Sequence, residues 1–200
     1  MQGLTTAQAA FVVGEPLGAF KKMIERAPLK TTLVRHGGRW VRQFSWGDLV
    51  FLRAYLDGAK QLFTPKAQSE LYEAILANIA DGRALDLVAF GELQYILARQ
   101  VVSLELKLKE LDELSAQIDA SGKEPVIRGT KVLVYRIAAL LDANMTLKEI
   151  LQDYPSLSKN QLLAAKAFAE THPKAGRPYP KLTVKAAMRA ADLSALDDVD

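Results

Sequence analysis

The chain has 200 residues, half of them hydrophobic, and a formal net charge of +3 at pH 7. This length and composition allow one or two domains with buried cores and exclude a largely disordered protein. Cysteine is absent and only two histidines are present, which excludes disulfides, thiolate zinc sites and cysteine nucleophiles. With no signal peptide and no apolar run of about 18 residues, we expect a cytoplasmic protein without a membrane partner.

The charge is unevenly distributed along the chain. Residues 1–60 hold nine basic and four acidic side chains, residues 61–120 five and ten, and residues 121–200 twelve and nine. The two ends are therefore basic and the middle is acidic. A partner with negative charge would be attracted to the ends.

The N-terminal residues predict a helix-turn-helix. Thr5 or Thr6 is a suitable N-cap for a first helix, Gly14 ends it, and Pro16 opens a second helix that extends through Ile24. Two short helices with a tight glycine-bearing turn are typical of DNA-binding heads.

A β-hairpin and a further helix follow this pair. Residues 32–34 and 40–44 predict two short strands, and a turn with two glycines after His36 joins them. Ser45 caps the next helix. The order of helix, turn, helix, wing and helix resembles the MerR-like winged-helix head over about the first 55 residues.

This resemblance implies a DNA interface made of basic side chains. On the second helix these are Lys21 and Lys22, followed by Arg26, and in the predicted wing they are Arg35, Arg39 and Arg42. A recognition helix and a wing would place them on bases and phosphates. The alternative is a solvated helix face and a plain hairpin with exposed arginines.

The middle of the chain predicts further helices. Thr64 and Pro65 open one of them. Residues 84–88 predict a short strand, and a leucine seam over residues 92–114 favours a long helix, although residues 102–108 also alternate as a strand would. That seam either packs inside the monomer or forms a homodimer interface, and the sequence leaves both open.

The C-terminal part predicts three short helices followed by an extended arm. A polar linker covers residues 119–124, and the first helix begins near Val134. Thr146 and Ser158 are N-caps of the second and third helices. From Lys174 onward the prolines predict an extended arm.

Three short segments carry a second resemblance. They are residues 125–131, Tyr154 with Pro155, and Pro173 with residues 176–178, and together they resemble a bacterial domain of unassigned function found in antitoxins of VapB type. Residues 120–123 and 132–133 depart from the pattern of that family. The resemblance implies an antitoxin that neutralises a PIN-like ribonuclease toxin and represses its own operon by binding operator DNA.

Five residues are candidates for binding this toxin partner. Arg128 and Lys131 flank Gly129 as basic arms, and Arg177, Pro178 and Tyr179 belong to the extended arm, where arginine and tyrosine are common interface anchors. The alternatives are a structural turn around Gly129, which would need its backbone freedom, and a plain linker in the arm.

We therefore predict a mainly α protein with an N-terminal winged helix-turn-helix and small β-hairpin, a helical middle and a C-terminal three-helix module. The predicted boundaries are 1–62 for the head, 63–120 for the middle, 121–173 for the antitoxin-type module and 174–200 for the arm. We expect a homodimeric antitoxin and transcription repressor that is not an enzyme and binds no cofactor or metal, because no nucleophile, metal cluster or phosphate loop is evident. The alternative is a stand-alone MerR-like transcription regulator without a toxin.

Overall fold

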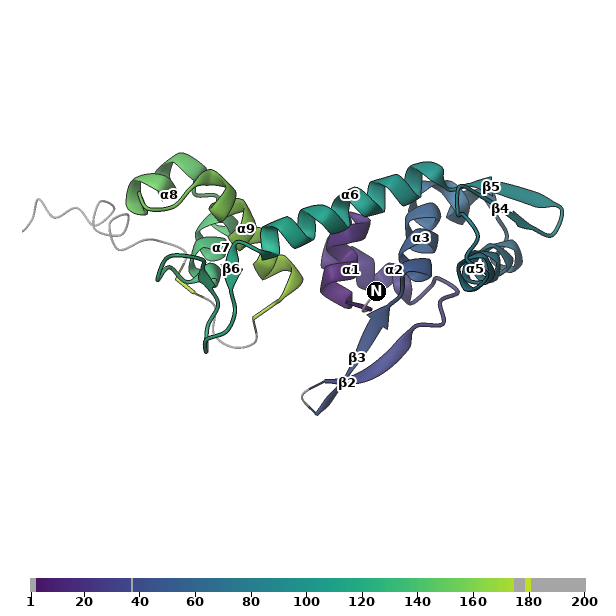
Figure 1. Cartoon of the computed structure of the whole chain (residues 1–200), viewed down its shortest axis with the longest axis horizontal. Coiled ribbons are helices and arrows are strands. Elements are labelled where there is room, and N and C mark those ends of the chain that lie inside the picture. Colours follow the sequence, from purple (N-terminus) through teal and green to yellow (C-terminus); the bar gives the residue numbers. More distant parts are fainter. Residues whose placement is uncertain (1–2, 37, 175–178, 181–200) are drawn as a thin grey trace, which may run out of the picture. The chain divides into compact units, whose positions relative to one another are not determined.

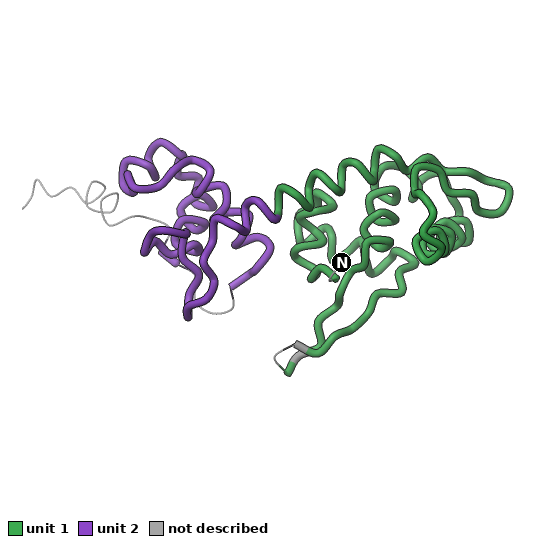
Figure 2. The backbone as a smooth tube through the Cα atoms, viewed as in Figure 1, with its two compact units in different colours: residues 1–111 green, residues 112–200 purple. Residues whose placement is uncertain are grey.

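The computed structural model describes residues 3–36, 38–174 and 179–180. It is mainly helical with a few small β-hairpins, as the sequence predicts. The chain divides into two compact units, residues 1–111 and 112–200 (Figure 2). Each unit has its own hydrophobic core, and the predicted head and most of the predicted middle share the first of these cores.

The first unit begins with a helix, a tight turn and a second helix. Helix α1 (Thr6–Val13) starts at Thr5, whose hydroxyl accepts a hydrogen bond from the backbone N–H of Gln8, while the Gln8 side chain accepts one from the backbone N–H of Thr5. Gly14 ends α1 in the left-handed conformation, at φ 86°. Helix α2 (Leu17–Ile24) follows, with Pro16 as its N-cap residue.

A three-stranded antiparallel sheet completes this part of the first unit. Its order is β1 (Leu4–Thr5), β3 (Arg39–Phe44) and β2 (Thr32–His36). Strands β2 and β3 form the predicted hairpin, which extends beyond the helices of the unit (Figure 1). At its base, the rings of Phe20 in α2 and Phe44 in β3 pack edge to face with centroids 5.4 Å apart.

The next helices carry the central core of the first unit. Ser45 caps α3 (Trp46–Ala54), which continues as a π-helical turn η1 (Tyr55–Ala59) and a short helix α4 (Lys60–Leu62). Thr64 caps α5 (Pro65–Ala80).

A buried hydrogen bond joins α3 to α5. The carboxylate of Asp48 accepts hydrogen bonds from Ser45 and, at 2.5 Å, from the hydroxyl of Tyr72. Burial and this hydrogen bond raise the pKa of Tyr72 well above its ordinary value of 10.0. The hydroxyl of Tyr72 therefore stays protonated and donates a hydrogen bond to the buried carboxylate of Asp48.

The segment after α5 differs in part from the prediction. Strands β4 (Leu87–Phe90) and β5 (Leu93–Ile96) form a hairpin, so the predicted long helix over residues 92–114 is wrong for its first residues. Helix α6 (Ala98–Ser115) covers the rest, and residues 102–108 are helical. Phe63 explains the difference, because its ring packs against both Phe90 and Tyr95, at centroid distances of 5.4 and 5.5 Å. Tertiary packing of aromatic rings overrides the local helical pattern there.

Helix α6 presents one apolar face to the core and another to solvent. Leu104 and Leu111 are buried with the core of the first unit. Val102 and Leu106 are 54% and 63% exposed. The leucine seam thus packs inside the first unit, and a second apolar face is left over.

The second unit contains the three predicted helices. Strands β6 (Ile118–Asp119) and β7 (Val126–Ile127) pair on either side of the predicted linker, and α7 (Val134–Asp142), α8 (Leu147–Asp153) and α9 (Lys159–Thr171) follow. Thr146 and Ser158 form the predicted N-caps. The core of the unit consists of aliphatic side chains from all five elements, including Ile118, Ile127, Ile137, Ile150 and Leu162.

Among the residues that the structure describes, no helix combines the length and apolar character needed to cross a bilayer.

Candidate nucleic-acid interface

The second helix of the helix-turn-helix is amphipathic, with its basic side chains outward. Phe20 and Ile24 are buried, whereas Lys21 and Lys22 are exposed. Arg26, which follows the end of α2, is also exposed. All three predicted basic residues on or just after this helix are therefore exposed to solvent, as a DNA-contacting helix requires.

The hairpin places two further predicted residues on one of its faces. Arg35 pairs with Trp40, and Arg42 pairs with Leu33. Since side chains alternate between the faces of a strand, these four residues share one face. The side chain of Arg39 lies outside the described part of the structure, although its backbone pairs with His36.

None of these described cations is neutralised by another residue that the structure describes. Ion pairs are absent at Lys21, Lys22, Arg26, Arg35 and Arg42 as far as the described residues reach. Arg53 of α3 is different, because it pairs with Asp57 at 3.1 Å and donates to the carbonyl of Val13 at 3.0 Å. The unpaired cations leave a positive surface whose counterions an anionic partner can displace.

Two residues near this surface escape the sequence analysis. Lys60, at the start of α4, lines the same surface pocket as Lys22 and Arg26, together with Glu15. No local signal indicates this, because Lys60 lies 34 residues after Arg26 in the sequence. Trp40, in contrast, alternates with the hairpin arginines in the sequence, and this pattern alone could have drawn attention to it.

In the second unit, the turn around Gly129 is built by hydrogen bonds within the chain. Gly129 adopts φ 76°, a conformation that favours glycine. The hydroxyl of Thr130 donates to the carbonyl of Ile127 at 2.8 Å and accepts from the N–H of Val132 at 3.1 Å. This loop is a structural turn that closes the strand pair onto α7.

The two basic arms of this turn have different surroundings. Arg128 donates from its guanidinium to the carbonyl of Ile118 at 3.3 Å, so it contributes to the turn itself. Lys131 is exposed, and no described residue forms an ion pair with its ammonium.

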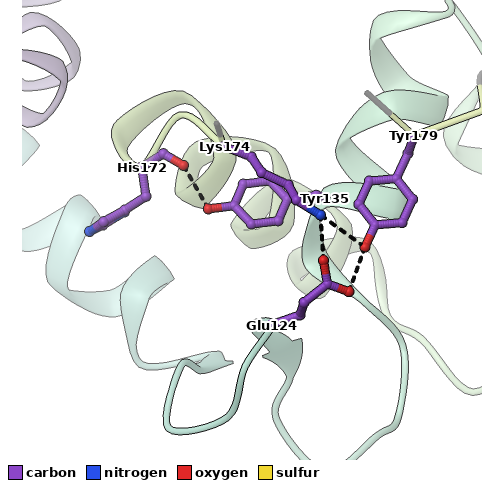
Figure 3. A network of polar contacts seen from close by, with 5 residues as sticks. All are labelled: Glu124, Tyr135, His172, Lys174 and Tyr179. Carbon is purple, nitrogen blue, oxygen red and sulfur yellow. Dashed lines mark hydrogen bonds and ion pairs between the residues drawn. The ribbon is translucent and has the colours of Figure 1, made fainter. Parts of the chain in front are cut away.

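A polar network fastens the segment after α9 to the second unit (Figure 3). Tyr135 of α7 donates to the carbonyl of His172 at 2.7 Å. Beyond it, Lys174 pairs with Glu124, and the hydroxyl of Tyr179 donates to the same carboxylate at 2.7 Å. Tyr179, one of the predicted partner-binding residues, therefore has its hydroxyl engaged inside the unit, while Arg177 and Pro178 lie outside the described residues.

The network shifts the titration of its members. Hydrogen bonds from Lys174 and Tyr179 hold the pKa of Glu124 below its ordinary value of 4.5, and the contact with Glu124 raises the pKa of Lys174. The ammonium of Lys174 also lies 4.3 Å from the centre of the Tyr179 ring. At neutral pH Glu124 is thus ionised, Lys174 is charged and Tyr179 is protonated, which are the states that these contacts require.

The described residues contain no group of three or more His, Asp or Glu side chains that could hold a metal ion.

Comparison with known proteins finds two similarities. Residues 118–169, which span β6 to α9, match a family described as "Protein of unknown function (DUF433)". Most of the chain is similar to the "Uncharacterized protein y4eO" of Sinorhizobium fredii, with 36% identity over 190 residues that cover 87% of this chain and 83% of the relative. No solved structure gives a significant match.

Proposed function

The chain belongs to the same family as y4eO of Sinorhizobium fredii, and we propose that it is a DNA-binding antitoxin. Its N-terminal head binds operator DNA and represses the operon, and its C-terminal module neutralises a PIN-like ribonuclease. Because the similarity covers most of both chains, the head and the C-terminal module belong together in the family.

The observation that carries the DNA-binding part is the set of unpaired cations on a helix-turn-helix and its hairpin. The order α1, turn, α2, hairpin and α3 supports the proposal, because it resembles the element order of a MerR-like winged-helix head. Lys21 and Lys22 on α2, and Arg35 and Arg42 on the hairpin, have charges that no described residue offsets. Such cations supply most of the affinity of a protein for DNA.

The exposed face of α6 supports a homodimer. Ala98, Val102 and Leu106 line a shallow apolar groove, with Arg99 near one end and Glu110 near the other. Two copies of α6 packed antiparallel about a two-fold axis would bring each Arg99 opposite the partner's Glu110. A dimeric repressor matches a two-fold symmetric operator.

The toxin-binding part rests on the resemblance of the C-terminal module to antitoxins of VapB type. Lys131 remains available on the surface for a partner. A second function, a stand-alone MerR-like regulator, is favoured by a specific observation. Arg128 and Tyr179, both predicted to bind the toxin, form hydrogen bonds within the second unit.

Co-expression with the product of the adjacent gene separates these two functions. An antitoxin would co-purify with that product and restore growth that the product alone inhibits. Absence of both effects, with DNA binding intact, would favour the stand-alone regulator.

The DNA-binding part is tested with the duplex that lies upstream of the gene. Lys21→Ala combined with Lys22→Ala should weaken binding and lower the slope of log affinity against log salt by about one for each lost phosphate contact. The matched control is Lys148→Ala with Lys166→Ala, which removes the same charge from exposed positions of the second unit. Equal losses in both double variants would contradict a specific interface on α2.

A further inference from the structure

The β2–β3 hairpin exposes a tryptophan. Trp40 is 69% exposed, and Leu33 on the neighbouring strand is 58% exposed. Large apolar side chains that are exposed together mark an interaction surface more often than single ones do. This face of the hairpin is therefore a candidate binding surface for another molecule.

The strand register shows what surrounds Trp40. Arg35 lies directly across from it, and Arg42 lies across from Leu33 on the same face. The opposite face carries the valine pair Val34 and Val41 instead. Trp40 and Leu33 thus form an apolar strip with a cation beside each of them.

The charge around this strip indicates the chemistry of the occupant. Residues 26–47 contain five lysines and arginines and no aspartate or glutamate. A second copy of the same head would be repelled by this charge. Duplex DNA is complementary to this face. Its phosphates carry the opposite charge, and they flank a groove whose floor and base steps accept apolar side chains.

We propose that Trp40 is an apolar wedge that enters the minor groove of duplex DNA and partly unstacks a base step, with Leu33 beside it. Arg35 and Arg42 bind the flanking phosphates and hold the hairpin in place. This inference rests on the proposed DNA-binding function and adds to it a deformation of the DNA, which a hairpin that only follows the backbone would not produce.

The test compares full-length variants on the duplex upstream of the gene, with end-to-end fluorescence energy transfer reporting the bend. Trp40→Ala should weaken binding about tenfold, abolish the bend and leave the salt slope unchanged, because no phosphate contact is lost. Arg35→Ala should instead lower the salt slope by about one. Trp40→Phe, which keeps an aromatic ring, should retain most of the bend. The matched control is Leu87→Ala, at a half-exposed apolar position in the β4–β5 hairpin, and it should change neither quantity.

Each other outcome overturns the proposal in a different way. If Trp40→Ala binds and bends the duplex as the unchanged protein does, the wedge is wrong while DNA binding stands. If the unchanged protein fails to bind the duplex even at low salt, the DNA-binding function fails and the wedge with it. If Trp40→Ala loses a co-purifying protein and keeps its DNA affinity, the face binds protein instead.

Discussion

At the scale of single residues, Gly129 illustrates how a short motif acts through its backbone. Its φ of 76° lies in a region that residues with a Cβ atom rarely adopt. A Cβ built at this position would nevertheless meet no described atom within 4 Å, apart from its neighbours in the chain. The cost of a substitution would therefore come from the backbone alone and not from a clash.

Gly129→Ala should lower the free energy of unfolding of the second unit by about 1 kcal/mol. Gly122→Ala is the matched control, because Gly122 has no positive φ and a Cβ there would make only ordinary van der Waals contact. Chemical denaturation of both variants measures the difference. An equal effect of the two substitutions would show that the conformation of Gly129 is not the cause.

At the scale of elements, the described residues that follow α9, among them Lys174, Tyr179 and Pro180, are held by contacts with distant parts of the second unit. Arg136 of α7 donates to the carbonyl of Pro180 at 3.0 Å, in addition to the contacts of Lys174 and Tyr179 with Glu124.

Glu124→Gln should loosen this segment, because a neutral amide cannot pair with the ammonium of Lys174. Trypsin should then cleave after Lys174 severalfold faster. Glu170→Gln is the control, since it removes an exposed carboxylate from the end of α9. If the two variants are cleaved at the same rate, the contact does not hold the segment.

The same contact should depend on pH. The pKa of Glu124 is lower in the folded protein than its ordinary value of 4.5. The stabilisation that its contacts with Lys174 and Tyr179 give is therefore fully present above pH 4.5. The contribution is lost as the pH falls through the lowered pKa. The NMR signals of the Tyr179 ring should report this loss in acid, and should be independent of pH in that range in Glu124→Gln.

At the scale of the whole molecule, the proposed function requires two copies of the chain. The apolar groove of α6 is the surface proposed for this assembly, since the opposite face of the same helix packs in the core of the first unit.

Leu106→Glu should convert the dimer to a monomer, because it places a charge in the apolar groove at the two-fold axis. Leu62→Glu is the control at another exposed leucine of the first unit, which is 72% exposed. Sedimentation of both variants gives their mass. The DNA affinity of Leu106→Glu should fall as well, because a monomer reaches only one half-site. A dimeric Leu106→Glu would place the interface elsewhere.

The features that could be predicted from the sequence depend on residues that are near neighbours in the chain. The caps at Thr5, Ser45, Thr146 and Ser158 were predictable, because each is made with the residue three positions further on. The two strands of the wing and the three C-terminal helices follow from hydrophobic periodicity in the same way. The basic character of the head was visible in the charge count alone.

The features that could not be predicted depend on partners that are distant in the sequence and meet through tertiary packing. Residues 93–96 became a strand because Phe63 packs on Tyr95 and Phe90, which outweighs a local helical pattern. Glu124 meets Lys174 and Tyr179 across 50 and 55 residues of sequence, a distance that no local pattern spans. The exposed fraction of Trp40 was likewise undetermined, because the alternation of a strand fixes which residues share a face and the packing of other elements decides which face is covered.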